Sequence, residues 1–170
     1  MPGARGLAAV SVALDVLARG ERLWVREATP SMLPLIRPGD ELLLAPLGSR
    51  TIGAGEVIAY RRESQLVIHR VLSAPGSGVV AKGDALASPD PLVPWDRVVA
   101  RVVALRGPDG RTANLDAFPW PLTHRLLGRM SWMAARLSLE SSGEAPPPFV
   151  RRLAWKAVRL PFYLARLVLR

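Results

Sequence analysis

The chain has no cysteine, only two histidines and no long uncharged apolar run. Without cysteine it cannot form a disulfide framework, a thiolate zinc site or a cysteine nucleophile. His69 and His124 alone do not make a convincing metal site, so we expect no metal and no other cofactor. No stretch reaches the roughly 18 uncharged apolar residues that a membrane span needs, so we expect no transmembrane helix.

The composition indicates one globular domain with an uneven charge. The chain has 170 residues, of which 49% are hydrophobic and 22% are charged, and its formal net charge is +9. Residues 1–116 carry 14 Lys and Arg against 12 Asp and Glu, whereas residues 117–170 carry 9 against 2. A nearly neutral body does not favour nucleic acid as a partner, and the positive charge belongs to the last third.

Hydrophobic periodicity divides the chain into three parts. Residues 6–19 have apolar side chains at helical spacing before Gly20, which predicts an amphipathic helix. A signal peptide is the alternative there, but Asp15 interrupts its apolar run. Period-two segments separated by turn residues then predict antiparallel strands near 21–26 and at 41–45, 56–62, 66–72, 78–82 and 97–105. We therefore expect a mainly β body over 21–116, an N-terminal helix over 1–20 and a helical extension over 117–170.

The stretch from Thr29 to Asp40, T-P-S-M-L-P-L-I-R-P-G-D, places one small hydroxyl residue between prolines directly after an alternating segment. Ser31 therefore stands where a rigid turn could expose its hydroxyl to a substrate as a nucleophile. A serine hydroxyl reacts only with a base in hydrogen-bond reach and with donors aimed at the developing oxyanion. The motif S-M-x-P alone is a weak signal, because Ser and Pro are common in ordinary turns.

Two later stretches contain suitable partners. His69 lies in the apolar, β-branched strand pattern L-V-I-H-R-V-L, where a lone histidine is more often a packed strand residue. Asp84 and Asp90 lie in the turn-rich stretch A-K-G-D-A-L-A-S-P-D, where aspartates usually cap turns. Each stretch alone would carry little weight.

In this order and spacing, the motifs resemble the signal peptidase I family from about residue 23 to residue 105. They are S-M-x-P with a following G-D (31–40), G-E-V-I (55–58), H-R-V (69–71), K-G-D-x5-D (82–90) and V-V-x-R-V (98–102). The resemblance implies the mainly β architecture that signal peptidases share with LexA-type autoproteases. That fold agrees with the antiparallel strands that the period-two pattern predicts without the resemblance.

A histidine stands where the common bacterial branch of this family has a lysine. This resembles the Ser-His-Asp branch of the endoplasmic-reticulum, archaeal and sporulation-type enzymes. The resemblance implies Ser31 as nucleophile, His69 as general base and then acid, and Asp90 as the carboxylate that orients the imidazole. Asp84 is the alternative for the third role, although a turn or supporting position suits it better. Lys82 could be the base of a Ser-Lys dyad, but its motif favours a structural role.

For the oxyanion hole, the resemblance implies the backbone N–H of Ser31 and the hydroxyl of Thr29. Pro30 replaces the glycine that often precedes the serine, and it removes one backbone donor. Ala100 likewise replaces the usual glycine before Arg101.

We expect the chain to lack the membrane anchor of the family and to use its basic tail in that place. Residues 122–138 put Arg125, Arg129, Trp132 and Arg136 on one stripe and Leu126, Met130, Met133 and Leu137 on another. Residues 149–170 put Arg152, Lys156, Arg159, Arg166 and Arg170 opposite Leu153, Ala157, Leu160, Leu164 and Leu167. Such helices suit an anionic membrane surface. The alternative is a helical pair that covers the edge of the β body and exposes its arginines.

We therefore expect a serine endopeptidase that cleaves a signal or leader segment from a polypeptide, either in the cytoplasm or at a membrane surface. A leader-peptide protease of a modified-peptide pathway is an equally defensible form of this hypothesis. A non-catalytic module that binds a membrane or an acidic partner is the alternative from another class. A LexA-type repressor is disfavoured, because no separate DNA-binding domain precedes the β body and the lysine base is absent from its expected motif.

Overall fold

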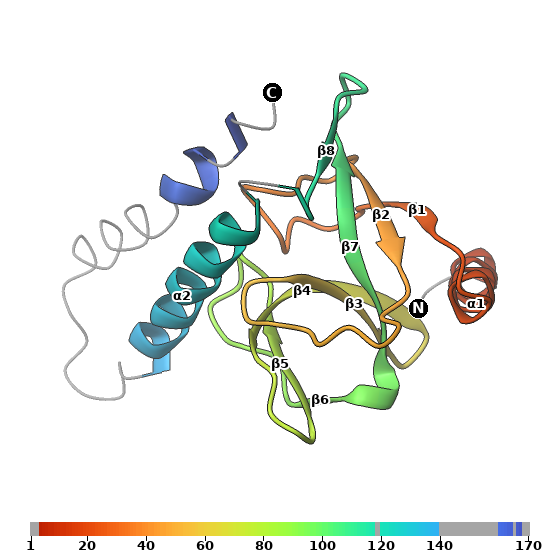
Figure 1. Ribbon diagram of the computed structural model, residues 1–170, viewed down its shortest axis with the longest axis horizontal. Coiled ribbons are helices and arrows are strands. Elements are labelled where there is room, and N and C mark those ends of the chain that lie inside the picture. The colour runs from red at the N-terminus through yellow and green to blue at the C-terminus, as the bar shows by residue number, and fades with distance from the viewer. Residues whose placement is uncertain (1–3, 118–119, 140–159, 165, 168–170) are drawn as a thin grey trace.

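The computed structural model describes residues 4–117, 120–139, 160–164 and 166–167. Its helices are α1 (Ala4–Ala18) and α2 (Trp120–Leu139), and residues 160–164 and 166–167 are also helical. The longer strands are β1 (Leu23–Arg26), β2 (Glu41–Ala45), β3 (Val57–Arg62), β4 (Gln65–Ser73), β5 (Gly78–Lys82) and β7 (Val98–Arg106). The short elements are β6 (Val93–Pro94), the 3₁₀ turn η1 (Trp95–Arg97) and β8 (Thr112–Asn114) (Figure 1).

The strands pair antiparallel in the order β1-β2-β7-β3-β4-β5-β6, and β8 adds to β7. The prediction of a mainly β fold with flanking helices is thereby confirmed. The bounds of β2 and β5 are the predicted ones, and those of β3, β4 and β7 differ by one residue at one or both ends. The short elements β6, η1 and β8 were not predicted, because two or three residues are too few to show a period.

Strand β3 is buried on both faces at the centre of the fold. Val57 and Ala59 belong to one hydrophobic cluster, whereas Ile58 and Tyr60 belong to a second. Since successive side chains of a strand point to opposite faces, the continuous apolar run of β3 separates the two clusters. The same alternation decides which side chains of β3 reach the candidate site.

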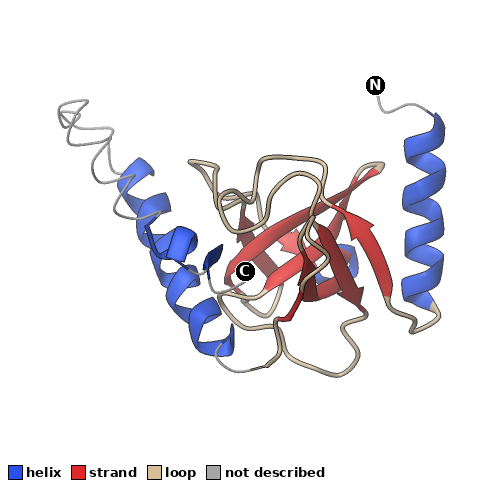
Figure 2. Cartoon of the chain, turned by 90° about the horizontal axis from the view of Figure 1, so that it is seen from above, coloured by secondary structure: helices blue, strands red, loops and turns tan. Residues whose placement is uncertain are grey.

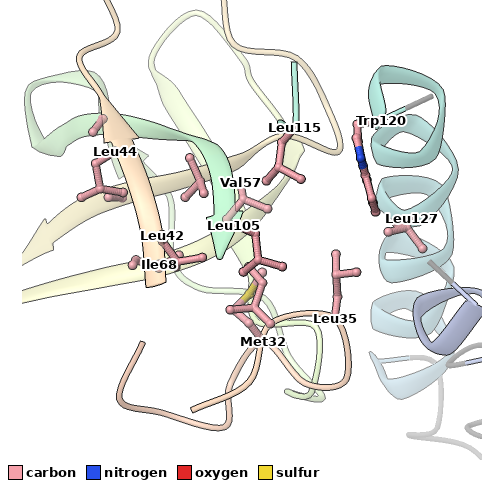
Figure 3. Packing of buried hydrophobic residues seen from close by; sticks show 14 of the residues in the cluster. Met32, Leu35, Leu42, Leu44, Val57, Ile68, Leu105, Leu115, Trp120 and Leu127 are labelled. Atoms are coloured by element: carbon pink, nitrogen blue, oxygen red, sulfur yellow. The ribbon is translucent and has the colours of Figure 1, made fainter. Parts of the chain in front are cut away.

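The first cluster includes the loop that follows Ser31. Met32, Leu35 and Ile36 are buried in it together with Trp120 and Leu127 of α2. Figure 3 shows Met32 and Leu35 between the strands and α2. Burying aliphatic side chains of this size contributes roughly 1.5–3 kcal/mol each. The serine-bearing loop is therefore part of the core rather than a free surface loop.

The two long helices lie on opposite sides of the strands (Figure 2). Helix α1 buries Ala13 and Leu17 and is followed by a turn at Gly20, whose φ of 82° allows the N–H of Glu21 to bond to the carbonyl of Val16. Helix α2 lies directly against the backbone at Gly55, where a Cβ atom would come within 1.9 Å of the His124 carbonyl oxygen. Glycine is therefore required at the point where α2 meets the β body.

The buried face of α2 is not the apolar stripe that the sequence suggested. Leu126 and Met133 are 53% and 58% exposed, and α2 instead buries Trp120, His124, Leu127, Gly128 and Ser131. Gly128 explains this orientation, because a Cβ there would lie only 2.7 Å from the Cα of Gly55. The close approach of helix and body requires a small side chain at position 128, while Trp120 and Leu127 pack beside it and Met130 of the predicted stripe is partly buried against the core.

The prediction that Arg166 lies on an exposed basic face is wrong. Arg166 is buried and donates hydrogen bonds to both carboxylate oxygens of Asp40, at 2.8 and 2.9 Å. A buried carboxylate requires a partner, and Arg166 supplies it from the far end of the chain. Leu160, Leu164 and Leu167 are exposed instead. The predicted positions Arg152, Lys156, Arg159, Arg170, Leu153 and Ala157 lie outside the described residues.

Candidate active site

Ser31 stands at the start of a series of tight turns that leads from β1 back to β2. The turns are closed by backbone hydrogen bonds from Leu33 to Pro30 and from Ile36 to Met32. The carbonyl oxygen of Ser31 also accepts a hydrogen bond of 2.8 Å from the N–H of Ala85. This bond ties the serine segment to the loop that follows β5.

His69 and Asp90 form a direct contact. Nδ1 of His69 lies 2.5 Å from Oδ2 of Asp90, and both side chains are nearly buried. His69 comes from the middle of β4, whereas Asp90 lies in the loop between β5 and β6, where its N–H bonds to the carbonyl of Ala81 at 2.8 Å. The carboxylate fixes Nδ1 as the protonated nitrogen and leaves Nε2 as a proton acceptor.

The other aspartate of this stretch has a different partner. Both oxygens of Asp84 accept hydrogen bonds from Arg70, at 2.9 and 2.7 Å, and both side chains are fully buried. Nζ of Lys82 donates to the carbonyls of Gly83 and Leu86, which closes the loop after β5. The structure thus places Asp90, and not Asp84, against His69, and Lys82 holds the loop.

Gly83 lies where His69 and the serine segment meet. A Cβ on Gly83 would come within 3.0 Å of Nε2 of His69 and within 2.7 Å of the Ser31 carbonyl oxygen. The acceptor nitrogen of His69 and the backbone of Ser31 are therefore neighbours across Gly83. Among the described residues, however, the hydroxyl of Ser31 bonds to Thr29, at 3.0 Å, and not to His69.

A chain of hydrogen bonds leads from Ser31 to the buried side chain of Glu27. Oε1 of Glu27 accepts the backbone N–H of Thr29 at 2.8 Å and its hydroxyl at 2.7 Å. Because the only hydroxyl proton of Thr29 goes to this carboxylate, Ser31 is the donor in its bond to Thr29. In this state Thr29 has no proton left for an oxyanion. The N–H of Ser31 has no hydrogen-bond partner within the described part of the chain.

Asp90 is held on its other oxygen as well. Nη2 of Arg62 donates to Oδ1 at 2.6 Å and also to the hydroxyl of Tyr60. Burial raises the pKa of Asp90, but the hydrogen bond and charge of His69, and after them the hydrogen bonds of Arg62 and Tyr60, outweigh burial, so the net shift is downward. Asp90 therefore stays ionised at neutral pH.

Sequence reasoning missed Glu27, Tyr60 and Arg62. Glu27 lies two residues before Thr29 and four before Ser31, which were both predicted site residues. Tyr60 and Arg62 lie two residues apart on β3. Period two places such residues on one face of an extended chain. That spacing was the available signal, but it does not reveal which face meets His69.

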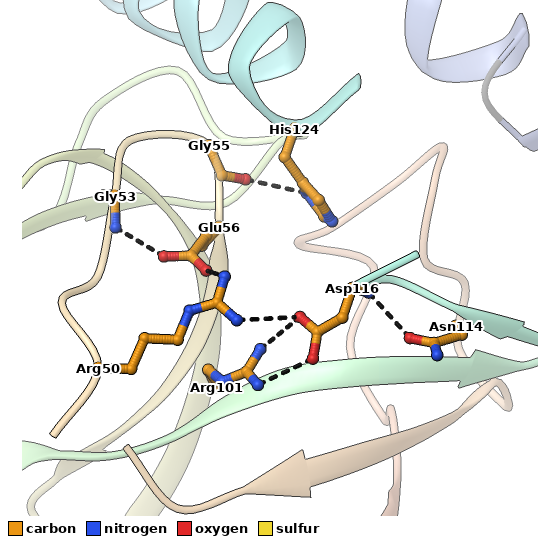
Figure 4. Close-up of polar contacts among 8 residues, drawn as sticks. All are labelled: Arg50, Gly53, Gly55, Glu56, Arg101, Asn114, Asp116 and His124. Atoms are coloured by element: carbon orange, nitrogen blue, oxygen red, sulfur yellow. Dashed lines mark hydrogen bonds and ion pairs between the residues drawn. The ribbon is translucent and has the colours of Figure 1, made fainter. Parts of the chain in front are cut away.

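A second polar cluster lies near the start of β3, beside a pocket of about 310 Å³ that Glu56 and Val57 help to line. Arg50 contacts both Glu56 and Asp116, and Arg101 makes two hydrogen bonds to Asp116 (Figure 4). The hydrogen bonds from Arg101 lower the pKa of Asp116. Because these charges compensate one another, we assign the cluster to attachment of the segment before α2 and not to chemistry.

Neither a scan against protein-family models nor a search of curated proteins found a match to this chain. Within the described residues, no three His, Asp or Glu side chains gather as a metal site would require. None of the helices there has the length and apolar character to cross a bilayer.

Proposed function

We propose that the protein is a serine endopeptidase that cleaves a signal or leader segment, with Ser31 as nucleophile, His69 as base and Asp90 as orienting carboxylate. The observation that carries the proposal is the position of His69. Its Nδ1 bonds to Asp90 at 2.5 Å, while its Nε2 faces Gly83 and the Ser31 segment. A histidine between a carboxylate and a serine is the arrangement that nucleophilic acyl transfer needs. The motifs from 31–40 to 98–102 supply the substrate class by resemblance.

In the proposed reaction, Oγ of Ser31 attacks the carbonyl carbon of the scissile peptide bond while its proton passes to Nε2 of His69. The imidazolium, stabilised by Asp90, then gives this proton to the leaving amine, and an acyl ester remains on Ser31. His69 next takes a proton from a water that attacks the ester carbon, and it gives this proton to Oγ of Ser31 as the bond between the acyl carbon and Oγ breaks, which releases the carboxylic acid and restores Ser31 and His69. The N–H of Ser31, which bonds to no described residue, is the available backbone donor for the oxyanion.

The bond between Ser31 and Thr29 has to open before this reaction. Catalytic hydrogen bonds are often long or misaligned without substrate and form when it binds. The proposal therefore requires the Ser31 hydroxyl to turn from Thr29 to Nε2 of His69 in the substrate complex. In this proposal the bond from the N–H of Thr29 to Glu27, which the structure shows, is kept during the change.

The test is cleavage of a peptide mixture prepared from a bacterial proteome, with new termini identified by mass spectrometry. The wild type should produce a defined set of termini, Ser31→Ala and His69→Ala should produce none, and Ser49→Ala should behave as the wild type. Ser49 is an exposed serine and serves as the matched control. Cleavage by purified Ser31→Ala protein would refute the mechanism. A folded wild type without any cleavage would favour the non-catalytic binding module.

We also propose that this enzyme associates with an anionic membrane surface. Eight of the eleven exposed large hydrophobic side chains of the described residues lie on α2 or in 160–167. They are Leu122, Leu126, Trp132, Met133, Leu160, Tyr163, Leu164 and Leu167. Exposed Arg125 and Arg129 stand among those of α2, in a part of the chain with strong positive charge. Apolar side chains beside cations suit the interface of an anionic bilayer.

Point variants test this surface better than deletion of 149–170, because deletion would also remove buried Arg166. The wild type should sediment with phosphatidylglycerol-containing vesicles, less so in high salt, and a Leu160→Glu/Leu164→Glu protein should stay in solution. Val12→Glu changes an equally exposed residue on α1 and should bind as the wild type does. Failure of the wild type to bind at low salt would refute the proposal.

A further inference from the structure

Only one carboxylate oxygen of Asp90 bonds to His69, so a second contact is needed to fix the rotation of the carboxylate. Asp90 lies outside the regular strands, and its backbone is tied by one bond to Ala81. The other oxygen, Oδ1, accepts a 2.6 Å hydrogen bond from Nη2 of Arg62. The carboxylate is therefore held between His69 on one side and Arg62 on the other.

The strand register explains why Arg62 reaches this site. In the β3–β4 pair, Ile58 stands opposite His69 and Arg62 stands opposite Gln65. Directly paired residues point to the same face of a sheet, and every second residue of a strand does so too. Ile58, Tyr60 and Arg62 therefore share the face of His69, while Arg61 points to the opposite face.

Tyr60 joins Arg62 to the histidine. Its ring lies edge to face against His69, with centroids 6.2 Å apart and an interplanar angle of 63°. Its hydroxyl accepts a hydrogen bond from the same Nη2 that binds Asp90. Tyr60 is buried, and burial together with the neighbouring Asp90 charge raises its pKa, so the hydroxyl stays protonated. One guanidinium nitrogen thus links Tyr60 and Asp90 around His69.

We propose that Arg62, supported by Tyr60, is a positioning residue that holds Asp90 in the rotamer that bonds Nδ1 of His69. This inference rests on the proposed function of Ser31, His69 and Asp90. The side chain of Arg62 is 45% exposed, and ion pairs that are partly open to water contribute little to stability. Its effect should therefore appear in turnover and not in folding.

The chain offers a matched control for the variant Arg62→Met. Arg61→Met removes the same charge from the adjacent exposed position, whose side chain points to the other face of β3. Arg62→Lys keeps a cation, and because a single nitrogen makes both contacts, it should recover part of the lost activity. Tyr60→Phe removes only the hydroxyl that supports the arginine.

With full-length proteins and a peptide that the wild type cleaves, Arg62→Met should lower kcat by roughly 10- to 100-fold, the cost of a small misplacement of a catalytic group. KM and the melting temperature should change little, because in this proposal Arg62 neither binds substrate nor contributes much to the stability of the fold. Arg61→Met should match the wild type, and Tyr60→Phe should lie between the two. An Arg62→Met protein with the kcat of Arg61→Met would overturn the inference.

A proton NMR readout separates this inference from the proposed function. The Nδ1 proton of His69 bonded to Asp90 should give a low-field signal, assigned by its loss in His69→Gln. Arg62→Met should shift or broaden this signal, and Arg61→Met should leave it unchanged. If that is seen but the wild type cleaves no peptide, the positioning of Asp90 stands and the peptidase proposal fails. If the wild type cleaves but neither kcat nor the signal responds to Arg62→Met, only the positioning role fails.

Discussion

Mild acid should destabilise the protein through His124, which attaches α2 to the β body. The imidazole is buried, with Nδ1 at 3.1 Å from the carbonyl oxygen of Gly55 and 3.2 Å from Nη1 of Arg70. Burial, and after it the positive charge of Arg70, lowers the pKa of His124 to about 3. A charged imidazole is therefore excluded from the folded state at any pH above this value.

The size of the effect follows from the difference between the folded and unfolded chains. In the unfolded chain a histidine binds its proton near pH 6.5, whereas His124 in the folded state does not. This stability contribution is complete above about pH 6.5 and is lost progressively as the pH falls towards about 3. Each pH unit in this window costs about 1.4 kcal/mol, so a change from about pH 7.5 to about pH 5 should cost about 2 kcal/mol.

The assay is urea unfolding of the wild type and of His124→Gln at these two pH values. Glutamine cannot be charged, while the other titrating groups are the same in both proteins and cancel in the comparison. The free energy of unfolding of the wild type should fall by about 2 kcal/mol more than that of the variant. Equal losses in the two proteins would show that His124 is not held neutral by its surroundings.

Three further substitutions separate stability from turnover. Arg166→Met should lower the free energy of unfolding by about 3 kcal/mol, because it leaves a buried carboxylate unpaired, whereas exposed Arg125→Met should change it by less than about 0.5 kcal/mol; equal melting curves would contradict this. Asp84→Ala should likewise destabilise the protein by about 3 kcal/mol by leaving the Arg70 guanidinium buried without its carboxylate. Asp90→Asn should instead reduce kcat by on the order of 10³- to 10⁴-fold with a small change in unfolding, and the reverse ranking in kcat would give Asp84 the orienting role.

Period-two alternation was sufficient to predict most of the β body. The strands around Ser31 and His69 carry apolar runs bounded by turn residues, and such runs can only be buried by pairing. The neighbourhood of the candidate site was predictable by resemblance, because its motifs lie in or beside these strands. The choice between Asp84 and Asp90 required the structure, since both aspartates stand in the same turn-rich loop and both bond to an arginine, but only Asp90 also contacts His69.

The tail was predicted poorly for a different reason. Helical periodicity identifies faces, but it does not decide which face is buried when both contain apolar and basic side chains. On α2 the choice depends on Gly128 meeting Gly55, a contact between residues far apart in sequence. For Arg166 it depends on Asp40, a buried carboxylate more than a hundred positions earlier. Neither partner is visible in the local pattern of the helix.

Contacts that sequence reasoning missed, two of them between residues far apart in the chain, converge on the loop that carries Ser31. Arg166 binds the carbonyl of Leu35 as well as Asp40, so the C-terminal segment holds the far end of this loop. Glu27 holds its near end through Thr29, and Ala85 holds the Ser31 carbonyl from the loop that leads to Asp90. A nucleophile is effective only if its position relative to its base is fixed to within a fraction of an ångström. The residues that fix it here are Glu27 beside the loop, Ala85 after β5 and Arg166 near the C-terminus, and the helical extension therefore supports the candidate active site as well as presenting the apolar surface.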